Sequence, residues 1–507
     1  MLATVQAATL LGVRGSPVRV EVHVSNGIPG LNIVGLPDAS CREARDRVRA
    51  AVITSGFKWG EFRVTVNLAP SAIRKVGSGL DLAIAVGFLR ATKQVPNPEC
   101  GDDSMAFLGE LGLDGTLRQI VGVVPLAACI ETPELVVPPR NAREAQVLSR
   151  HRVLTAESLG EVVACLKGDS PWSVPGPMEP DPTPPPPDLA DVRGNRFARF
   201  ALEVAAAGGH HLLYVGPPGS GKTMLAERMP GVLGRLSADE AIDVTTVHSA
   251  AGETLPANGL IEMPPFRAPH HTVSNVALVG GGSHALRPGE ISLAHNGVLF
   301  LDELGEFSAV ALDALRQPLE SGVIHISRAH ASAAMPASFQ LIAAMNPCPC
   351  GFAGARRQEC RCTPAALNRY SRRLSGPLLD RFDLRLRVEP TDTVDLLSVE
   401  RGEPTVEVAE RVAKVRERSA RRGARVNRLL SSTELDRLVG LEAPARELLD
   451  DALASGRLSG RGLRRIKSVG LTLDDLRGGD GTLDAGVIAH ALSLRADLRF
   501  GEAAVMS

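Results

Sequence analysis

Aromatic residues are scarce in this sequence, and neither sign of charge predominates. Phe, Trp and Tyr make up 3% of the 507 residues, which argues against an extended platform of rings for stacking single-stranded nucleic acid. The formal net charge of −1 argues against a uniformly basic coat. Any contact with nucleic acid is therefore expected to be local and directed mainly at backbone phosphates.

Long apolar runs are also missing. The first fifteen residues lack the basic segment, apolar core and cleavage site of a secretory signal. The longest apolar candidate for a membrane span, Leu80 to Leu89, is too short and contains Asp81. We therefore expect a soluble, cytoplasmic protein without a membrane segment, in which the eight cysteines are reduced.

The length suggests roughly three domains of ordinary size, and composition changes along the chain indicate their boundaries. Residues 1–168 predict an α/β domain. Residues 169–188 include four consecutive prolines and predict a semi-rigid linker, with a ligand for a proline-recognition module as the alternative. Residues 189–391 predict a nucleotide-binding core, and residues 392–507 predict a charged helical lid.

The amino-terminal domain shows both common periodicities. Alternating residues predict strands at 18–24 and 63–68, and an amphipathic pattern predicts a helix at 41–55. The basic face of that helix is either solvated or in contact with a partner or nucleic acid.

A glycine-rich stretch between a buried-strand pattern and a helical pattern is the clearest functional signal. It matches G-x-x-x-x-G-K-[ST] at every fixed position. In this pattern glycines allow backbone N–H groups to wrap a polyphosphate, the lysine neutralises the β- and γ-phosphates, and the final hydroxyl binds Mg²⁺. A chance glycine-rich loop is the alternative, but the strand and the helix are both in register. The predicted nucleotide-binding residues are Gly216, Pro217, Pro218, Gly219, Ser220, Gly221, Lys222 and Thr223.

Four further residues complete the chemistry expected of nucleotide hydrolysis. The apolar strand 298–301 ends in Asp302, expected to hold Mg²⁺ through water, and Glu303, expected to orient or deprotonate the attacking water. Asn346 follows another apolar strand, where its amide would position that water; alone, an Asn at a strand end is more often a turn residue. In a ring ATPase an arginine placed like Arg381 reaches the γ-phosphate of the neighbouring subunit. An isolated arginine between two acids is more often a surface ion pair.

Four of the cysteines lie within fifteen residues as C-x-C, nine intervening residues and C-x-C. Four thiolates that close a short loop suit tetrahedral Zn²⁺, and a metal would rigidify a segment too polar to fold alone. The C-x-C spacing is tighter than the common C-x₂-C, so free reduced thiols and a redox switch remain as alternatives. The predicted zinc ligands are Cys348, Cys350, Cys360 and Cys362.

Three polar stretches are candidates for contact with a threaded polymer. The segment 267–282 contains His270 and His271, which we expect to point apart and therefore to form a polymer-facing loop rather than a joint metal site. The segment 323–339 alternates like a hairpin with basic side chains. Residues 410–428 contain eight Lys/Arg against two Glu and are either a solvated helix or a contact for DNA phosphates.

Long motifs outside the glycine-rich loop also match one family. They are PFRAPHHTVSNVALVGGG (265–282), PGEISLAHNGVLFLDELGEF (288–307), MNPCPCG (345–351) and LSGPLLDRFDL (374–384). With them, nearly the whole sequence resembles the Mg-chelatase-like AAA+ ATPases of the ComM/YifB type. The implied fold class is α/β, with a P-loop AAA+ core and a helical lid.

Two amino-terminal motifs belong to the same resemblance, GLPDASCREARDRVRAAV (35–52) and VTVNLAPSAIRKVGSGLDLAIA (64–85). They are similar to the family's first domain, whose fold is akin to ribosomal protein S5 domain 2 and the Lon protease domain. A Lon-like fold raises serine–lysine proteolysis as a function. The stretch that matches the protease motif places Gly79 at the nucleophile position, with Ser78 one residue off, so the dyad is expected to be absent.

The resemblance implies a hexameric ring that binds ATP and Mg²⁺ and hydrolyses ATP between subunits. For competence-type members it implies a DNA motor that drives branch migration during recombination of transforming DNA. It also implies that Arg461 is a second sensor of nucleotide. This chain has Gly470-Leu471-Thr472 where relatives carry Ala-Arg-Thr, which weakens the expected coupling of the lid to nucleotide but not the ATPase.

The expected function is therefore that of an ATPase acting on DNA as a helicase or translocase. The main alternative is a chelatase-type motor or a remodeller of a protein partner. A large domain precedes the motor, and no metal-adhesion partner motif is present; both features disfavour a true Mg-chelatase.

Overall fold

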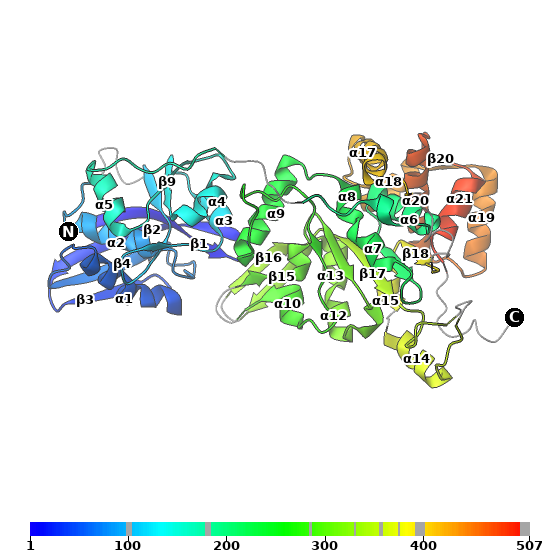
Figure 1. Cartoon of the computed structure of the whole chain (residues 1–507), viewed down its shortest axis with the longest axis horizontal. Helices are drawn as coiled ribbons and strands as arrows, with labels where there is room; N and C mark the ends of the chain where they lie inside the picture. Colours follow the sequence, from blue (N-terminus) through cyan, green and yellow to red (C-terminus); the bar gives the residue numbers. More distant parts are fainter. Residues whose placement is uncertain are drawn as a thin grey trace.

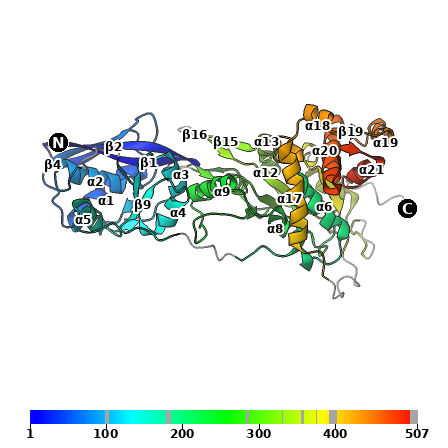
Figure 2. The ribbon, with the colours of Figure 1, turned by 90° about the horizontal axis from the view of Figure 1, so that it is seen from above.

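The computed structural model of the chain shows three bodies arranged along one axis. The amino-terminal domain lies at one end, the nucleotide-binding core in the middle and a helical region at the other end (Figures 1 and 2). Among the described residues, no helix is long and apolar enough to cross a bilayer. The structure describes residues 1–97, 104–177, 184–282, 286–328, 331–353, 358–373, 376–390 and 401–496.

The amino-terminal domain is built on one seven-stranded mixed sheet in the order β3-β4-β2-β1-β5-β8-β9. Its strands are β1 (Leu2–Leu11), β2 (Arg14–Asn26), β3 (Gly30–Val34), β4 (Phe62–Ala69), β5 (Met105–Phe107), β8 (Glu134–Val137) and β9 (Arg152–Thr155). Its helices are α1 (Ala39–Thr54), α2 (Asp81–Ala91), α3 (Val123–Cys129), α4 (Ala142–Gln146) and α5 (Leu159–Lys167). The strands predicted at 18–24 and 63–68 and the helix predicted at 41–55 are confirmed as parts of β2, β4 and α1.

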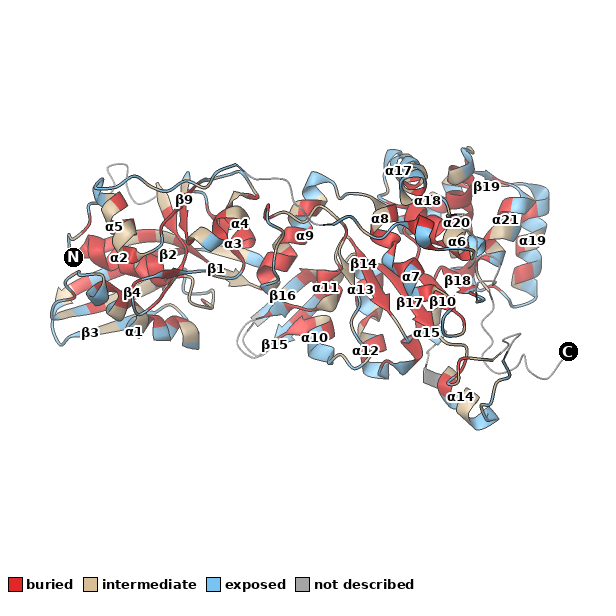
Figure 3. Ribbon diagram, in the orientation of Figure 1, coloured by how far each residue is buried: buried red, intermediate tan, exposed pale blue. Residues whose placement is uncertain are grey.

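The longest apolar run of the sequence is the core helix α2. Every residue of α2 is buried (Figure 3), so the run packs between the sheet and α1 instead of meeting lipid. Burial raises the pKa of Asp81 to about 6, against the opposing effect of Arg47. The Arg47 guanidinium lies 2.7 Å from the Asp81 carboxylate and neutralises it inside the domain.

The nucleotide-binding core contains a five-stranded parallel sheet in the order β11-β14-β17-β10-β18. These strands are β11 (Phe266–Arg267), β14 (Val298–Leu301), β17 (Gln340–Met345), β10 (Leu212–Val215) and β18 (Leu384–Arg387). β10, β14 and β17 are buried along their whole length, as expected for a parallel sheet covered on both faces. Because all five strands run the same way, the segments that follow them meet at one edge.

Helices, a hairpin and a second short antiparallel pair, β12 (Gly280–Gly281) with β13 (Arg287–Pro288), surround this sheet. The hairpin predicted at 323–339 is confirmed as two antiparallel strands, although its tip lies outside the described residues. The elements are α6 (Arg196–Gly208), α7 (Lys222–Glu227), α8 (Met229–Leu233), α9 (Ala238–Ala251), α10 (Asn275–Val279), α12 (Ala309–Ala314), α13 (Arg316–Ser321), β15 (Val323–Arg328), β16 (Ala331–Pro336), α14 (Pro364–Arg373) and α15 (Gly376–Leu379).

The carboxy-terminal region is helical and shares an apolar cluster with the core. Its helices are α17 (Thr405–Arg421), α18 (Ser432–Leu438), α19 (Ala443–Ala454), α20 (Gly460–Arg477) and α21 (Ala485–Ser493). It joins the core at the amino end of the parallel sheet, where His210 Nε2 lies 2.9 Å from Thr472 Oγ1 of α20. The glycine-rich loop follows the carboxyl end of β10, at the edge of the sheet opposite this contact, and α17 also packs on α6 and α8.

The basic run at 410–428 is packed against the rest of the chain. Arg421 and Lys414 are exposed at the surface, and 79% of the Arg421 side chain is accessible. Five of the other basic residues bind protein groups, so a DNA-phosphate contact by any of them would have to replace an existing pair. The pairs are Arg411 with Glu203 and Glu403, Arg416 with the Ala206 carbonyl, Arg422 with Asp475, Arg425 with Glu240, and Arg428 with the Gly209 carbonyl.

The amino-terminal domain and the core are joined by more than the linker. The turn between β1 and β2 inserts into the apolar cluster of the core through Val13. At Gly12, a Cβ would lie 2.9 Å from Ala333 of β16. The linker is ordered at its described ends: Thr155 N donates to the Ser173 carbonyl at 2.8 Å, and Asp188 accepts from Thr405 N at 2.7 Å.

Candidate nucleotide site

The glycine-rich loop connects the carboxyl end of β10 to the first turn of α7. Gly219 and Gly221 have φ of +76° and +82°, a region that favours glycine. The Lys222 ammonium lies inside the loop, 2.7 Å from the Gly216 carbonyl and 2.8 Å from that of Pro217. Burial lowers the pKa of Lys222, and Asp302 opposes that effect. The loop therefore holds a cation beside a row of backbone N–H groups, which suits a polyphosphate.

Thr223 and Asp302 meet at the same edge of the sheet. The Thr223 hydroxyl donates to Asp302 Oδ2 at 2.9 Å, although the two residues are far apart in sequence. Asp302 directly follows β14, and both β14 and β10 pair with β17. A hydroxyl and a carboxylate oxygen are ligands that Mg²⁺ prefers, so this pair fits the predicted magnesium site.

Glu303 has a backbone and a partner that the sequence did not reveal. Its φ is +52°, an uncommon value for a residue other than glycine. Glu303 Oε2 lies 3.2 Å from Nδ1 of His271, which follows β11 at the edge of the sheet beside β14. The rings of His270 and His271 lie with centroids 4.1 Å apart and planes tilted by 35°, so the expectation that these histidines point apart is wrong. The signal that could have found this contact is the adjacency of β11 and β14.

Asn346 follows β17, between the strands that supply Asp302 and the glycine-rich loop. Its carbonyl oxygen accepts a hydrogen bond at 3.0 Å from the hydroxyl of Tyr370 in α14. The structure thus brings Asn346 to the same edge of the sheet as Thr223 and Glu303. Sequence reasoning missed Tyr370, because α14 returns to this edge only after the cysteine-containing loop.

Arg381 and Arg461 lie elsewhere in the chain. Arg381 donates to the Pro377 carbonyl at 2.7 Å and pairs with Glu320 of α13. Arg461 is exposed in the first turn of α20. Among the contacts of the described residues, neither arginine touches the glycine-rich loop, Asp302 or Glu303 of its own chain. The same-chain site therefore consists of the loop, Asp302, Glu303 and Asn346, with His271 and Tyr370 beside them.

The four clustered cysteines converge as the sequence predicted. Their sulfur atoms all lie within 4.8 Å of one another. The cluster begins directly after Asn346 and Pro347 and ends directly before α14 (Figure 1). This group could hold a metal ion.

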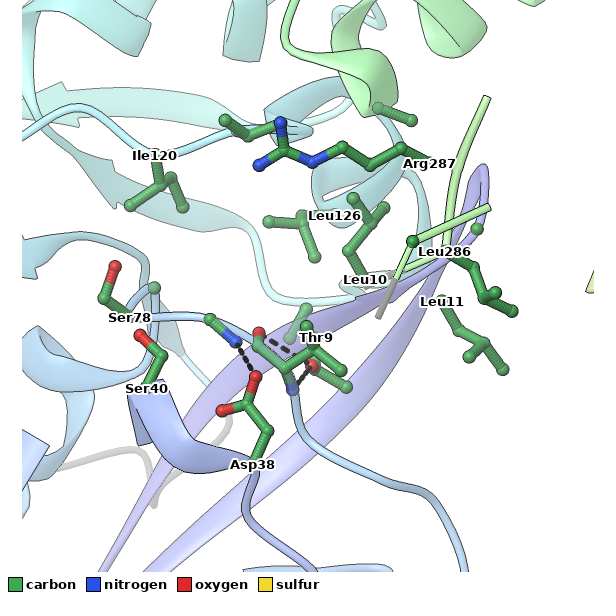
Figure 4. Close-up of a pocket in the computed structure, with 18 of the residues that line it drawn as sticks. Thr9, Leu10, Leu11, Asp38, Ser40, Ser78, Ile120, Leu126, Leu286 and Arg287 are labelled. Atoms are coloured by element: carbon green, nitrogen blue, oxygen red, sulfur yellow. Dashed lines mark hydrogen bonds between the residues drawn. The ribbon is translucent and has the colours of Figure 1, made fainter. Parts of the chain in front are cut away.

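A separate cavity of about 780 Å³ lies between the amino-terminal domain and the core. Ser78 faces it (Figure 4), and the Ser78 hydroxyl donates to Glu110. The ammonium of Lys75 is buried and donates to the Pro70 carbonyl. Among the contacts of the described residues, none joins Ser78 to Lys75.

Comparison with known proteins finds family matches in the amino-terminal domain, the core and the helical region. The family description "Magnesium chelatase, subunit ChlI" matches residues 188–396, "Subunit ChlI of Mg-chelatase" matches residues 20–141, and "Magnesium chelatase, subunit ChlI C-terminal" matches residues 402–495. Together with the parallel sheet, glycine-rich loop and acidic pair, these matches define an AAA+-type P-loop ATPase.

Full-length relatives narrow the class. The chain is 43% identical over 507 residues to the competence protein ComM of Haemophilus influenzae, covering 98% of each. It is 42% identical over 479 residues to the protein YifB of Escherichia coli, covering 94% of this chain and 93% of the relative. A weaker similarity, 26% over 209 residues, links it to Lon protease 2 of Bacillus subtilis, covering 34% and 35%. The chain belongs to the ComM/YifB-type, Mg-chelatase-like family.

Proposed function

We propose that this protein is a ring-forming motor that hydrolyses ATP to move DNA, as a helicase or translocase in the recombination of incoming DNA. The observation that carries the ATPase part is the meeting of Thr223 and Asp302 beside Glu303. The DNA part is supported by full-length similarity to a relative named a competence protein. The protein would act in the cytoplasm.

The residues of the phosphate site have separable roles in this proposal. Backbone N–H groups of residues 216–223 and the Lys222 ammonium bind the β- and γ-phosphates of ATP. Bound Mg²⁺, held by Thr223 and through water by Asp302, would neutralise charge on those phosphates. Glu303 orients or deprotonates the attacking water, and Asn346 fixes its position.

Two arginines favour a ring, most simply a hexamer. Arg381 and Arg461 have no contact with the phosphate site of their own chain among the described contacts. We propose that Arg381 exchanges Glu320 for the γ-phosphate bound by a neighbouring copy, where it stabilises charge in the transition state. Arg461 senses nucleotide from the helical region. The nucleotide site is then completed by a second copy of the chain.

A second candidate function follows from the match to magnesium chelatase. In that reading the same ATPase drives a chelatase-type reaction or remodels a protein partner. Branched or single-stranded DNA that stimulates ATP turnover supports the DNA motor. Stimulation only by a protein supports the alternative and contradicts the DNA proposal.

The direct test of the ATPase is Glu303→Gln. This variant keeps the phosphate-binding loop but loses the carboxylate, so it should bind ATP with unchanged affinity and lose turnover. Persistent hydrolysis would mean that another residue is the base. Branch-migration and strand-displacement assays on wild type and Glu303→Gln then test whether turnover is coupled to DNA.

We also propose that the cysteine cluster binds Zn²⁺. Four thiolates favour it over the harder Mg²⁺. It would be a structural ion outside the reaction itself.

A further inference from the structure

The cysteine cluster adjoins the nucleotide site through Asn346 and Gly351, and through α14, which follows it. We infer that the described parts of the loop closed by zinc, residues 348–353 and 358–362, are the support that positions Asn346 and the glycine-rich loop for hydrolysis. This inference rests on the proposed ATPase function. It assigns the metal a role in turnover, although no ligand of the metal takes part in the reaction.

The sulfur geometry fits a single tetrahedral ion. Cys348 Sγ lies 3.3 Å from Cys350 Sγ and 3.7 Å from Cys360 Sγ, and the last two are 3.6 Å apart. A tetrahedral zinc site with metal–sulfur bonds of about 2.3 Å places its sulfurs about 3.8 Å apart. A disulfide would bring two of them to about 2.05 Å. The four sulfurs therefore surround one point instead of forming pairs.

Backbone donors and the composition of the loop agree with a bound metal. Ala353 N donates to Cys348 Sγ at 3.2 Å, a contact that strengthens when the sulfur is a thiolate. Cys348 is fully buried, whereas Glu359 and Arg361 are exposed, so little apolar surface closes the loop. Zn²⁺ would replace the protons of four thiols, releasing up to four protons, and would supply the closing energy that a core cannot.

The loop holds Asn346 at both ends. One end is covalent, since only Pro347 separates Asn346 from Cys348. At the other end, α14 begins two residues after Cys362 and carries Tyr370, whose hydroxyl bonds the Asn346 carbonyl at 3.0 Å. Tyr370 is 6% exposed. Closing the sulfurs together therefore fixes the distance between the end of β17 and α14.

Gly351 of this loop lies against the glycine-rich loop, and Tyr370 of α14 lies against the segment after Glu303. Gly351 has φ of +85°, and a Cβ there would lie 2.7 Å from Cδ of Pro218 and 3.9 Å from Cγ of Asn346. A Cβ at Gly305 would lie 2.7 Å from the ring of Tyr370. The backbone at Gly351 thus packs against Pro218 and Asn346, and the ring of Tyr370 packs against Gly305. Opening the sulfur cluster would loosen all three contacts.

The expected consequence is a selective loss of turnover. Lys222, Thr223 and Asp302 bind phosphate and Mg²⁺ through contacts that do not include the cysteines. A displacement of about 1 Å in a positioning group costs on the order of 10²-fold in rate. Metal-free protein should therefore retain ATP binding within a few-fold and lose kcat by on the order of 10²-fold.

The first experiment compares zinc content with function. Wild type purified without chelator should contain one zinc per chain, and Cys360→Ser and Cys362→Ser should contain none. Cys129→Ser removes a thiol of the amino-terminal domain outside the cluster and should keep both zinc and turnover. Wild type without stoichiometric zinc, or with iron in its place, overturns the zinc assignment. Cysteine variants that lose zinc but keep wild-type kcat overturn the positioning role.

Removing and restoring zinc on the folded wild type avoids variants that fail to fold. Chelator-treated protein should lose kcat and regain it on addition of Zn²⁺, with far-ultraviolet circular dichroism unchanged. Tyr370→Phe should keep zinc and the KM for ATP while lowering kcat several-fold, because it removes the hydroxyl that bonds the backbone carbonyl of Asn346. A Tyr370→Phe variant with unchanged kcat contradicts this step.

Hydrogen exchange separates failure of this inference from failure of the ATPase proposal. Zinc removal should speed amide exchange at residues 216–223 and 340–353 and leave β1 and β2 unchanged. If wild type binds zinc but never hydrolyses ATP, the ATPase proposal fails, while exchange still reports whether zinc orders the loop. Exchange that does not respond to zinc overturns the inference, whatever the turnover.

Discussion

The carboxyl and amino edges of the core sheet both carry polar groups, but the two sets differ in burial. At the carboxyl edge Thr223 and Glu303 are exposed, and Asp302 is half-buried. At the amino edge Asp383 is buried and lies 3.3 Å from Arg465 of α20, while His211 N donates to its carboxylate at 3.0 Å. The carboxyl edge leaves polar atoms open to a ligand, and the amino edge buries them within the protein. Polar residues on one sheet can thus serve chemistry or architecture, and burial distinguishes the two.

The pKa values follow the same division. At the amino edge burial lowers the pKa of His210 to about 4. Burial alone would raise the pKa of Asp383, but Arg465, the neighbouring histidines and Arg428 hold it at about 2. These shifts make the amino edge the acid-sensitive part of the core.

The largest expected effect is at the carboxyl edge. Lys222→Ala removes the cation that faces the phosphates, and we expect kcat/KM for ATP to fall on the order of 10³-fold with an unchanged free energy of unfolding. Steady-state ATPase assays and urea unfolding of the same sample check both halves. If the free energy of unfolding fell by as much as the activation free energy rose, the carboxyl edge would also stabilise the fold.

At the amino edge we expect a substitution to lower stability and to leave nucleotide binding nearly unchanged. Asp383→Asn leaves Arg465 and Arg428 without their buried counter-charge, so the free energy of unfolding should fall by about 3 kcal/mol. Nucleotide affinity of the remaining folded protein should be nearly unchanged. Urea unfolding and binding of a fluorescent ATP analogue measure the two quantities. A variant as stable as wild type would show that the buried pair does not join the helical region to the core.

A pH series sharpens the same contrast. The pKa of His210 is lower in the folded protein, about 4, than its unfolded value near 6.5. Between these values the unfolded chain binds more protons, so stability falls as the pH falls, and His210 alone contributes about 2 kcal/mol of the fall from pH 6.5 to pH 5. Urea unfolding at both pH values should show a smaller fall in His210→Gln. An equal fall would assign the acid sensitivity to another group.

The smallest expected effect concerns Glu303. His271→Ala removes the partner that holds the Glu303 carboxylate. We expect kcat to fall by about 10-fold while the KM for ATP stays nearly constant. His23→Ala, an exposed histidine of β2, is the matched control. Equal kinetics in the two variants would mean that His271 does not position Glu303.

The sequence predicted the features that depend on local pattern. The glycine-rich loop, the strand before Asp302 and the cysteine spacing are each contained in one short segment. The packing of His271 against Glu303, of Tyr370 against Asn346 and of Gly351 against Pro218 is not, because each pair is brought together by strand order or by a returning helix. The arginines of 410–428 show the same limit. Their charge can be read from the sequence, but the carbonyl or carboxylate that each one pairs with cannot.

The insertion of Val13 into the apolar cluster that contains Ile326 and Met335 has a consequence for folding. A proline-rich stretch divides the covalent chain, yet the first domain and the hairpin β15–β16 share one hydrophobic core. Denaturation of this hairpin should therefore be cooperative with the β1–β2 turn, as parts of one unfolding unit. A truncated protein that begins at the linker would expose an apolar seam, and its aggregation would reflect that lost partner rather than a defective ATPase.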